Sequence, residues 1–266
     1  MNRIIIVGNG FDLAHGVKTS YKDFIEWYLG KVIESLRKNF FSYKDDLLEI
    51  KTIYNAIDMS IYTNPIDMST YIDNAKSNLE IIKKMKDIGK EFTFKFYPLF
   101  ERIIKDVENK GWVDIEMDYY ELLKDYALNK RGDVKRLNKE LSYIEKKLIK
   151  YLKEVENGYF SPNPIIKTFG EEIKKMIYED IAPRDLSIKY HRSSRNKEQD
   201  KQNRVVLLNF NYTKIADKYI DNKNDGFSVI HIHGKLDDEG GVIFGYGDEL
   251  DKKYKEIEEL NDNEYL

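Results

Sequence analysis

The feature that most constrains this chain is its start, where a short apolar run leads directly into glycine. Residues 4–7 are Ile-Ile-Ile-Val, Gly8-Asn9-Gly10 follows at once, and a helical pattern begins near Tyr21. A buried strand that ends in a glycine turn ahead of a helix presents backbone N–H groups to a phosphate. Glycine also permits positive φ and the close approach of a ligand. The pattern predicts a nucleotide site at the carboxyl end of the first strand of an α/β sheet, against the alternative of a tight turn that binds nothing.

The glycine turn matches no complete nucleotide-binding motif. The dinucleotide fingerprint requires a third glycine three positions after Gly10, where this chain has Leu13. The P-loop pattern is also absent, because no Gly-Lys-Ser/Thr follows. Support for a nucleotide site must therefore come from other parts of the chain.

Composition narrows the class of protein. The chain has 266 residues, 34% of them charged, with a net charge of −3, so no strong field favours nucleic acid. No apolar run approaches the length of a membrane span, and we expect no membrane association. The sequence contains no cysteine, which excludes disulfides and thiolate metal ligands and fits a cytoplasmic location. No His-x-x-x-His motif is present, so no zinc site is expected.

The middle of the chain, about residues 47–178, is predicted to be almost entirely helical. The clearest helix covers residues 133–156, begins at the capping residue Asp133 and ends at Asn157-Gly158. Its apolar residues alternate spacings of three and four, which is a heptad pattern. The pattern favours a helix packed in a bundle, or alternatively a homo-oligomer that forms through this helix. The apolar positions are Val134, Leu137, Leu141, Ile144, Leu148, Tyr151 and Val155.

Strand patterns return near the end of the chain. Residues 205–208, 227–232 and 241–244 are apolar runs, and residues 214–219 form a predicted helix between the first two. Together with the first strand they predict an α/β fold that is Rossmann-like, with a mainly parallel sheet and a large α-helical insertion. The predicted nucleotide-binding core comprises residues 1–40 and 200–266, and the insertion comprises residues 41–199. The polar, basic stretch 183–203 is predicted to be a surface loop.

Each returning strand ends in polar residues. Asn209 to Thr213 follow the first, His231 to Gly234 end the second, and Gly245 to Asp248 follow the third. In an open α/β sheet the carboxyl ends of the strands form the ligand crevice, so these residues should converge with Gly8 to Asp12. Asparagine can hold a hydroxyl or a water, and histidine can accept a proton near neutrality. Strand alternation predicts that His231 and His233 share one face. Taken singly, each is equally consistent with a capping or structural role.

At this point the chain resembles the AbiH family, bacterial proteins associated with abortive infection by phage. The opening motif Gly8 to Gly16, continued by Thr19-Ser20-Tyr21 and Asp23-Phe24, is similar to the start of that family. The later motifs follow in the family's order. They are Trp112-x-Asp114-x-Glu116, Phe210-Asn211-Tyr212-Thr213, His231-Ile232-His233-Gly234 and Phe244-Gly245-Tyr246-Gly247.

AbiH proteins in turn look distantly like sirtuin-like NAD-binding domains. In that resemblance Asn211 matches an asparagine and His233-Gly234 matches the catalytic His-Gly, whereas Thr213 stands where the sirtuin domain has Asp. The absence of a four-cysteine zinc module argues against protein deacylation. The activity that the resemblance implies is hydrolysis of NAD or a related nucleotide, which is then a substrate or ligand and not a tightly bound cofactor.

The resulting hypothesis is a phage-defence enzyme with His233 as general base and Asn211 orienting ribose and water. Backbone N–H groups of Gly8 to Gly10 hold phosphates, Asp12 binds a ribose hydroxyl or polarises water, and Asp248 completes the rim. Two alternatives remain: a nucleotide-sensing module without turnover, which Thr213 favours, and a helical protein-interaction scaffold. The residues expected to contact the nucleotide are Gly8, Asn9, Gly10, Phe11, Asp12, His15, Asn209, Tyr212, Thr213, His231, Gly234, Gly245 and Asp248.

Overall fold

The structure is a computed structural model of the chain. It describes residues 2–39, 42–53, 69–87, 92–111, 113–129, 132–159, 165–175, 204–220, 226–237 and 241–244, with residues 256, 257 and 259. The chain divides into two compact units. The first contains residues 1–20 and 152–243, and the second contains residues 21–151 and 244–266.

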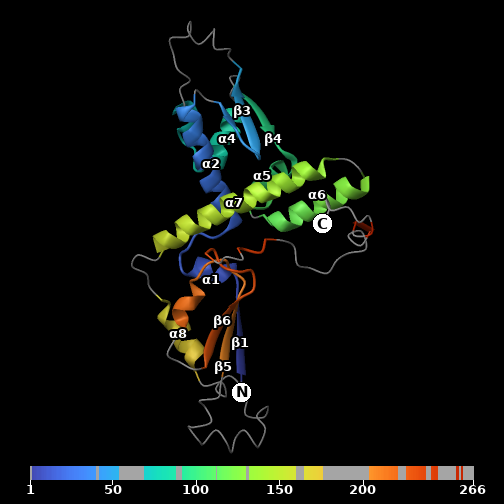
Figure 1. The fold of residues 1–266 in the computed structure, drawn as a ribbon. Coiled ribbons are helices and arrows are strands. Elements are labelled where there is room, and N and C mark those ends of the chain that lie inside the picture. Colours follow the sequence, from blue (N-terminus) through green and yellow to red (C-terminus); the bar gives the residue numbers. More distant parts are fainter. Residues whose placement is uncertain are drawn as a thin grey trace, which may run out of the picture. The chain divides into compact units, whose positions relative to one another are not determined.

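The described elements mix strands and helices along the chain, and four helices follow one another in its middle (Figure 1). The early elements are β1 (Asn2–Val7), α1 (Asn9–Ala14), α2 (Tyr21–Lys38), β2 (Tyr43–Lys44), β3 (Leu48–Thr52), α3 (Ser69–Ile72), α4 (Asn78–Asp87) and β4 (Phe92–Phe96). The later ones are α5 (Pro98–Lys110), α6 (Ile115–Asn129), α7 (Val134–Tyr159), α8 (Lys167–Lys174), β5 (Arg204–Asn209), the 3₁₀ helix η5 (Ala216–Tyr219) and β6 (Phe227–His231).

The first unit is built on a parallel sheet with the strand order β1-β5-β6. Ile4 of β1 pairs with Val206 of β5, which pairs with Ser228 of β6. The predicted α/β class and the predicted parallel pairing of the two chain ends are therefore confirmed. The finer description of the fold as Rossmann-like stays a prediction.

The two faces of this sheet differ in their surroundings. Val7, Val205 and Leu207 are buried on one face, where Phe11 of α1 and Phe169 of α8 pack against them. The intervening residues point to the opposite face, because side chains alternate along a strand. That face remains open, with Ile4 66% and Ile6 71% exposed. The apolar run of β1 thus supplies the core with only every second residue.

Two sequence predictions for this unit were wrong. Residues 241–244 were predicted to form a third returning strand, but their described pairing is a single antiparallel bridge between Gly234 and Val242. The helix predicted over residues 214–219 is the short 3₁₀ helix η5.

The second unit contains an antiparallel sheet of strand order β2-β3-β4 within the region that was predicted to be helical. Residues 48–52 read Leu-Glu-Ile-Lys-Thr and residues 92–96 read Phe-Thr-Phe-Lys-Phe. Both show the period-two alternation of a half-buried strand. Each strand is only five residues long, and the sequence around both has longer helical patterns. The alternation was therefore not recognised as strand.

The long predicted helix is present as α7, with Asp133 as its cap. The Oδ1 atom of Asp133 accepts the backbone N–H of Arg136 at 3.0 Å. The helix passes through Asn157 and Gly158 to Tyr159, so the predicted stop was wrong. Leu137, Ile144 and Leu148 of its apolar stripe are buried within the chain, so the structure does not support a homo-oligomer through this stripe. Among the described residues, no helix combines the length and hydropathy needed to cross a membrane.

Asp45 organises the polar interior of the second unit. Its Oδ2 atom accepts hydroxyl hydrogens from Tyr28 at 2.7 Å, Tyr43 at 2.6 Å and Tyr143 at 3.0 Å. Its Oδ1 atom accepts the backbone N–H groups of Leu47 and Leu48. Burial and the adjacent carboxylate raise the pKa of Tyr28 above its ordinary value. One side chain thus joins α2, α7 and the turn before β3.

Glu140 of α7 caps the start of α5 from a different helix. Its Oε2 atom accepts the backbone N–H of Leu99 at 2.9 Å and of Phe100 at 3.4 Å. The side chain is fully buried, and its Oε1 atom has no hydrogen-bond partner in the described part of the chain. Burial raises the pKa of Glu140 to about 7. Between pH 4.5 and about pH 7, the carboxyl group of Glu140 is therefore protonated in the folded chain and ionised in the unfolded chain.

The variant Glu140→Gln tests this cap, because glutamine keeps an oxygen for both N–H groups but cannot ionise. The folded pKa of about 7 lies above the ordinary 4.5, so stability from this group is full below 4.5 and is lost as the pH rises through 7. Between about pH 5 and about pH 8 the variant should gain up to ~3 kcal/mol of unfolding free energy relative to wild type. Urea unfolding at both pH values measures this gain. The matched control is Glu145→Gln on the same helix, and an equal trend in both variants would contradict the assignment.

Candidate functional site

One buried carboxylate joins α1, which follows β1, to the loop that follows β5. Asp12 is 1% exposed, and its Oδ1 atom accepts a hydrogen bond from Asn211 Nδ2 at 2.9 Å. Its Oδ2 atom accepts the hydroxyl hydrogen of Thr213 at 2.7 Å. The second hydrogen of the Asn211 amide is donated to the carbonyl oxygen of Gly8 at 3.0 Å. Residues about two hundred positions apart are thus brought together at the carboxyl edge of the parallel sheet.

The electrostatics of Asp12 reflect its burial. Desolvation raises its pKa to about 6, and the nearby carboxylate of Glu156 adds to the increase. The hydrogen bonds from Thr213 and Asn211 act in the opposite direction, because they stabilise the charged form. The donors to Asp12 are both neutral, and their hydrogen bonds stabilise its ionised form inside the protein.

Asn209 fixes the loop that carries Asn211 and Thr213. The side chain is fully buried. Its Oδ1 atom accepts the backbone N–H of Asn211 at 3.0 Å, and its Nδ2 atom donates to the carbonyl oxygen of Thr213 at 3.0 Å. The same Nδ2 atom lies 3.2 Å from Nδ1 of His231. Both amide hydrogens are therefore committed, and Asn209 acts as a positioning residue.

These contacts determine the tautomer of His231. Because Asn209 Nδ2 is a donor, Nδ1 of His231 must accept, which leaves the ring hydrogen on Nε2. Nε2 lies 2.8 Å from Oδ1 of Asp217, to which it donates. Both ring nitrogens are thus engaged within the chain. The structure gives His231 a supporting place beside the loop after β5.

His233 lies in a different environment. β6 ends at His231, so His233 belongs to the following turn, and the prediction that both histidines share a strand face was wrong. The ring of His233 lies near the rings of Phe210, at 5.7 Å between centroids, and Tyr212, at 6.0 Å. Within the described ranges, its ring makes no hydrogen bond. Its nitrogens are therefore open to an incoming group.

His15 and Phe11 belong to an aromatic cluster on the buried face of the parallel sheet and not to an open surface. Their ring centroids are 4.3 Å apart, and Phe169 and Tyr219 complete the cluster. Nδ1 of His15 lies 2.6 Å from the carbonyl oxygen of Phe11, and Nε2 contacts the hydroxyl of Tyr219. That hydroxyl also accepts the backbone N–H of Ile166 at 2.8 Å. Both residues thus pack α1 against η5 and the start of α8.

Gly8 is extended, and Asn9 and Gly10 begin α1. Gly8 has φ −129° and caps α1 without a side-chain hydrogen bond. Gly8 and Gly10 both lie outside the left-handed region, so the turn does not use the positive φ that glycine permits. Among the residues that the structure describes, a Cβ atom at either position would meet nothing within 4 Å, so none of them fills the space beside the turn.

The remaining predicted residues have mixed placements. Asn9 accepts the hydroxyl hydrogen of Thr19 at 2.7 Å. Gly234 has φ 74°, and a Cβ atom there would lie 2.4 Å from the carbonyl oxygen of Gly241, so only glycine fits. Gly245 and Asp248 lie outside the described residues.

Sequence reasoning missed two carboxylates of this site. Glu156, at the end of α7, is 5% exposed and accepts the backbone N–H of Lys214 at 2.6 Å. Asp217 holds His231. Neither stands in a recognisable motif, and Glu156 is one of many charged residues on its helix. In the described part of the chain, no group of three or more His, Asp or Glu residues is arranged to hold a metal ion.

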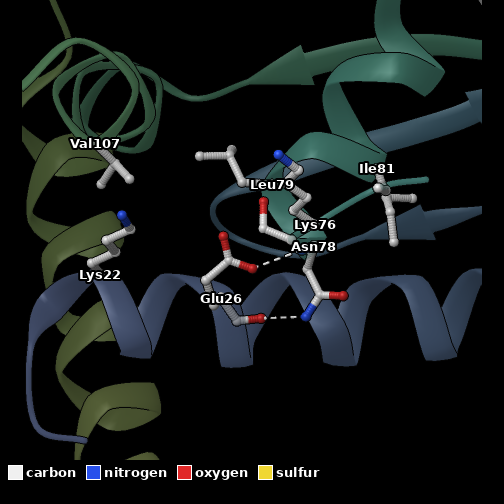
Figure 2. Close-up of a pocket in the computed structure, with 9 residues that line it drawn as sticks. Lys22, Glu26, Lys76, Asn78, Leu79, Ile81 and Val107 are labelled. Atoms are coloured by element: carbon white, nitrogen blue, oxygen red, sulfur yellow. Dashed lines mark hydrogen bonds between the residues drawn. The ribbon is translucent and has the colours of Figure 1, made fainter. Parts of the chain in front are cut away.

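The second unit contains a separate cavity of about 670 Å³. It lies between α2, the start of α4 and Val107 of α5 (Figure 2). Glu26 crosses it, since its Oε2 atom accepts the backbone N–H of Asn78 at 2.7 Å and its carbonyl oxygen accepts Asn78 Nδ2 at 2.9 Å. Lys22 and Lys76 also line the cavity. Charges of both signs therefore face it, and they select no single class of ligand.

A family model described as "Bacteriophage abortive infection AbiH" matches residues 4–265 of the chain. No curated protein and no solved structure matches.

The variant Thr213→Val tests the tie at Asp12, because it removes the hydroxyl with little change of shape. The buried Oδ2 atom of Asp12 loses its donor, so unfolding free energy should fall by about 1–3 kcal/mol. The pKa of Asp12 should rise further above 6, and the loss should therefore grow as the pH rises through that value.

The matched control is Thr19→Val, which removes the same hydroxyl from the exposed hydrogen bond to Asn9. Its effect on unfolding free energy should stay within about 0.5 kcal/mol. Denaturant unfolding of both variants measures the difference. Equal losses in the two would show that Thr213 does not support Asp12.

Proposed function

Because this chain belongs to the AbiH family of bacteriophage abortive-infection proteins, we propose that it defends the cell by cleaving NAD or a related nucleotide in the cytoplasm. The proposed site is the carboxyl edge of the parallel sheet, between the loops after β1 and β5. The defence role follows from the family, and the nucleotide chemistry is our inference from the residues at this edge.

One observation carries the proposal, namely the convergence of Gly8, Asp12 and Asn211. Ligands of open α/β sheets bind beyond the carboxyl ends of the strands. The hydrogen bonds from Asn211 to Gly8 and Asp12 hold two such strand ends at one edge. An amide, a glycine turn and open space then adjoin each other. This arrangement suits a ligand with phosphate and ribose groups.

The glycine turn supplies the proposed phosphate contacts. The first turn of α1 begins at Gly8 without a side-chain cap, so the N–H groups of Asn9 and Gly10 are free of capping side chains. Open space beside both glycines lets a phosphate approach these groups. This contact is a matter of backbone geometry, and any side chain larger than glycine would narrow the approach.

His233 is the proposed general base. It accepts a proton from a water molecule whose oxygen forms a bond to ribose C1′, while the bond from C1′ to the nicotinamide nitrogen breaks. Nicotinamide takes the bonding electron pair and leaves as a neutral ring, so no acid is needed to protonate it. Asn211 donates both amide hydrogens within the chain, which leaves its Oδ1 atom to orient the water or a ribose hydroxyl. Asp12 then acts by positioning Asn211, in place of the direct ribose contact expected from sequence.

A nucleotide sensor is the second candidate. Thr213 stands where sirtuin-like domains have Asp. Its hydroxyl group donates a hydrogen bond to Asp12. Without the carboxylate that sirtuin-like domains have at the position of Thr213, the site would bind the nucleotide but would not cleave it. Calorimetry with NAD, ADP-ribose and ATP, combined with analysis of products, distinguishes a sensor from a hydrolase.

The two histidines provide the sharpest test. His233→Ala should lower NAD turnover by about 10²–10⁴-fold, the usual contribution of a positioned base. Its thermal unfolding should match wild type, because its ring makes no hydrogen bond in the described part of the chain. His231→Ala should lower the unfolding temperature, since Asn209 and Asp217 each lose one hydrogen-bond partner. Product analysis and thermal unfolding measure both effects.

Each outcome has a distinct meaning. Unchanged turnover in His233→Ala would remove this residue from the mechanism. Binding of NAD by wild type without products would support the sensor. Failure of wild type to bind any of the three nucleotides would end the proposal for this site.

A further inference from the structure

The open face of the parallel sheet is an ordered array of apolar side chains. From Ile4, Val206 and Ser228 onward, every second residue points to it, and these residues lie side by side because the strands pair in parallel. Two backbone hydrogen bonds, from Phe210 N to Val7 O and from Ile232 N to Asn209 O, continue the array one position past the strand ends. The array consists of Ile4 and Ile6, then Val206, Leu208 and Phe210, then Ser228, Ile230 and Ile232.

These side chains are exposed to an unusual degree for a parallel sheet. Ile6 is 71%, Ile230 49% and Phe210 42% exposed. Parallel sheets are normally covered on both faces, and their strands are apolar on both sides for that reason. In the described ranges, the side chains that pack on this sheet lie on the opposite face. The open face therefore lacks the cover that its composition requires.

We propose that this face binds the same face of a second copy of the chain. The eight residues of the array carry no charge and only Ser228 is polar, so two copies can pack these residues together without burying a charge. Asn2 and Arg204, which pair at the amino ends of β1 and β5, precede the array. Such a face is complementary to itself, as a two-fold interface requires. Two sheets packed face to face interdigitate their side chains in this way.

The size of the array fits this partner. Its exposed side chains present roughly 500 Å² of apolar surface, which is at the upper end of patches found on monomers. Two copies would together bury on the order of 1,000 Å², the area at which specific interfaces begin. The proposal is independent of any nucleotide chemistry. The rings of Phe210 and His233 are neighbours, so the interface would border the candidate site.

The variant Ile6→Lys tests this interface. Ile6 lies on the outer strand β1 and pairs with Leu208, so a lysine there places a charge within the array without entering the core. Sedimentation equilibrium and light scattering should give wild type twice the mass of one chain. The variant should dimerise more than about tenfold more weakly. Ile230→Lys, on β6, should have the same effect.

The control is Ile53→Lys, which changes an isoleucine that is 53% exposed and belongs to the other unit. It should leave the mass unchanged. Thermal unfolding of every protein under dilute conditions separates association from folding, and Ile6→Lys should unfold at the wild-type temperature. A monomeric wild type would overturn the proposal. So would dimers that persist in both array variants, or a large loss of unfolding temperature in dilute Ile6→Lys, which would mean that the chain covers this face itself.

Discussion

The first unit depends on the hydrogen bonds that reach the carboxylate of Asp12. Asn211 and Thr213 each donate to one of its oxygens, and both belong to a loop about two hundred residues further along the chain. Burial raises the pKa of this carboxyl group to about 6, so without these donors its charge would be costly inside the protein. The loops after β1 and β5 therefore stay together for an electrostatic reason that adds to the packing of the sheet.

Asn209 connects the hydrogen bonds at Asp12 to His231. Its amide holds the loop at Asn211 and Thr213, and the same amide makes His231 an acceptor at Nδ1. Asp217 then receives the ring hydrogen. The ring of His233 makes no hydrogen bond with the residues that the structure describes, so the two histidines differ in their surroundings. His231 supports the loop after β5, and His233 is the residue that we propose to act on a ligand.

The sequence was informative where long patterns or ordered motifs existed. The parallel sheet, the α/β class and the cap at Asp133 were all predictable, because each rests on local periodicity or on a simple topological rule. The strands β3 and β4 were not recognised, since five alternating residues carry little signal among long helices. The roles of Glu156 and Asp217 arise only from tertiary contacts, which no spacing in the chain encodes. The same is true of His15, whose place among aromatic rings depends on Phe169 and Tyr219.

The hydrogen bond from Asn211 to the carbonyl oxygen of Gly8 has a consequence for the whole sheet. β1 is apolar on both sides, so hydrophobicity alone does not distinguish its observed alignment from one shifted along the neighbouring strand. A shift by a single residue would move Gly8 past the amide and break this bond. The hydrogen bond from Asn211 therefore fixes the register of β1 against β5. Loss of this amide would allow β1 to shift along β5, which changes the pairing of the whole strand.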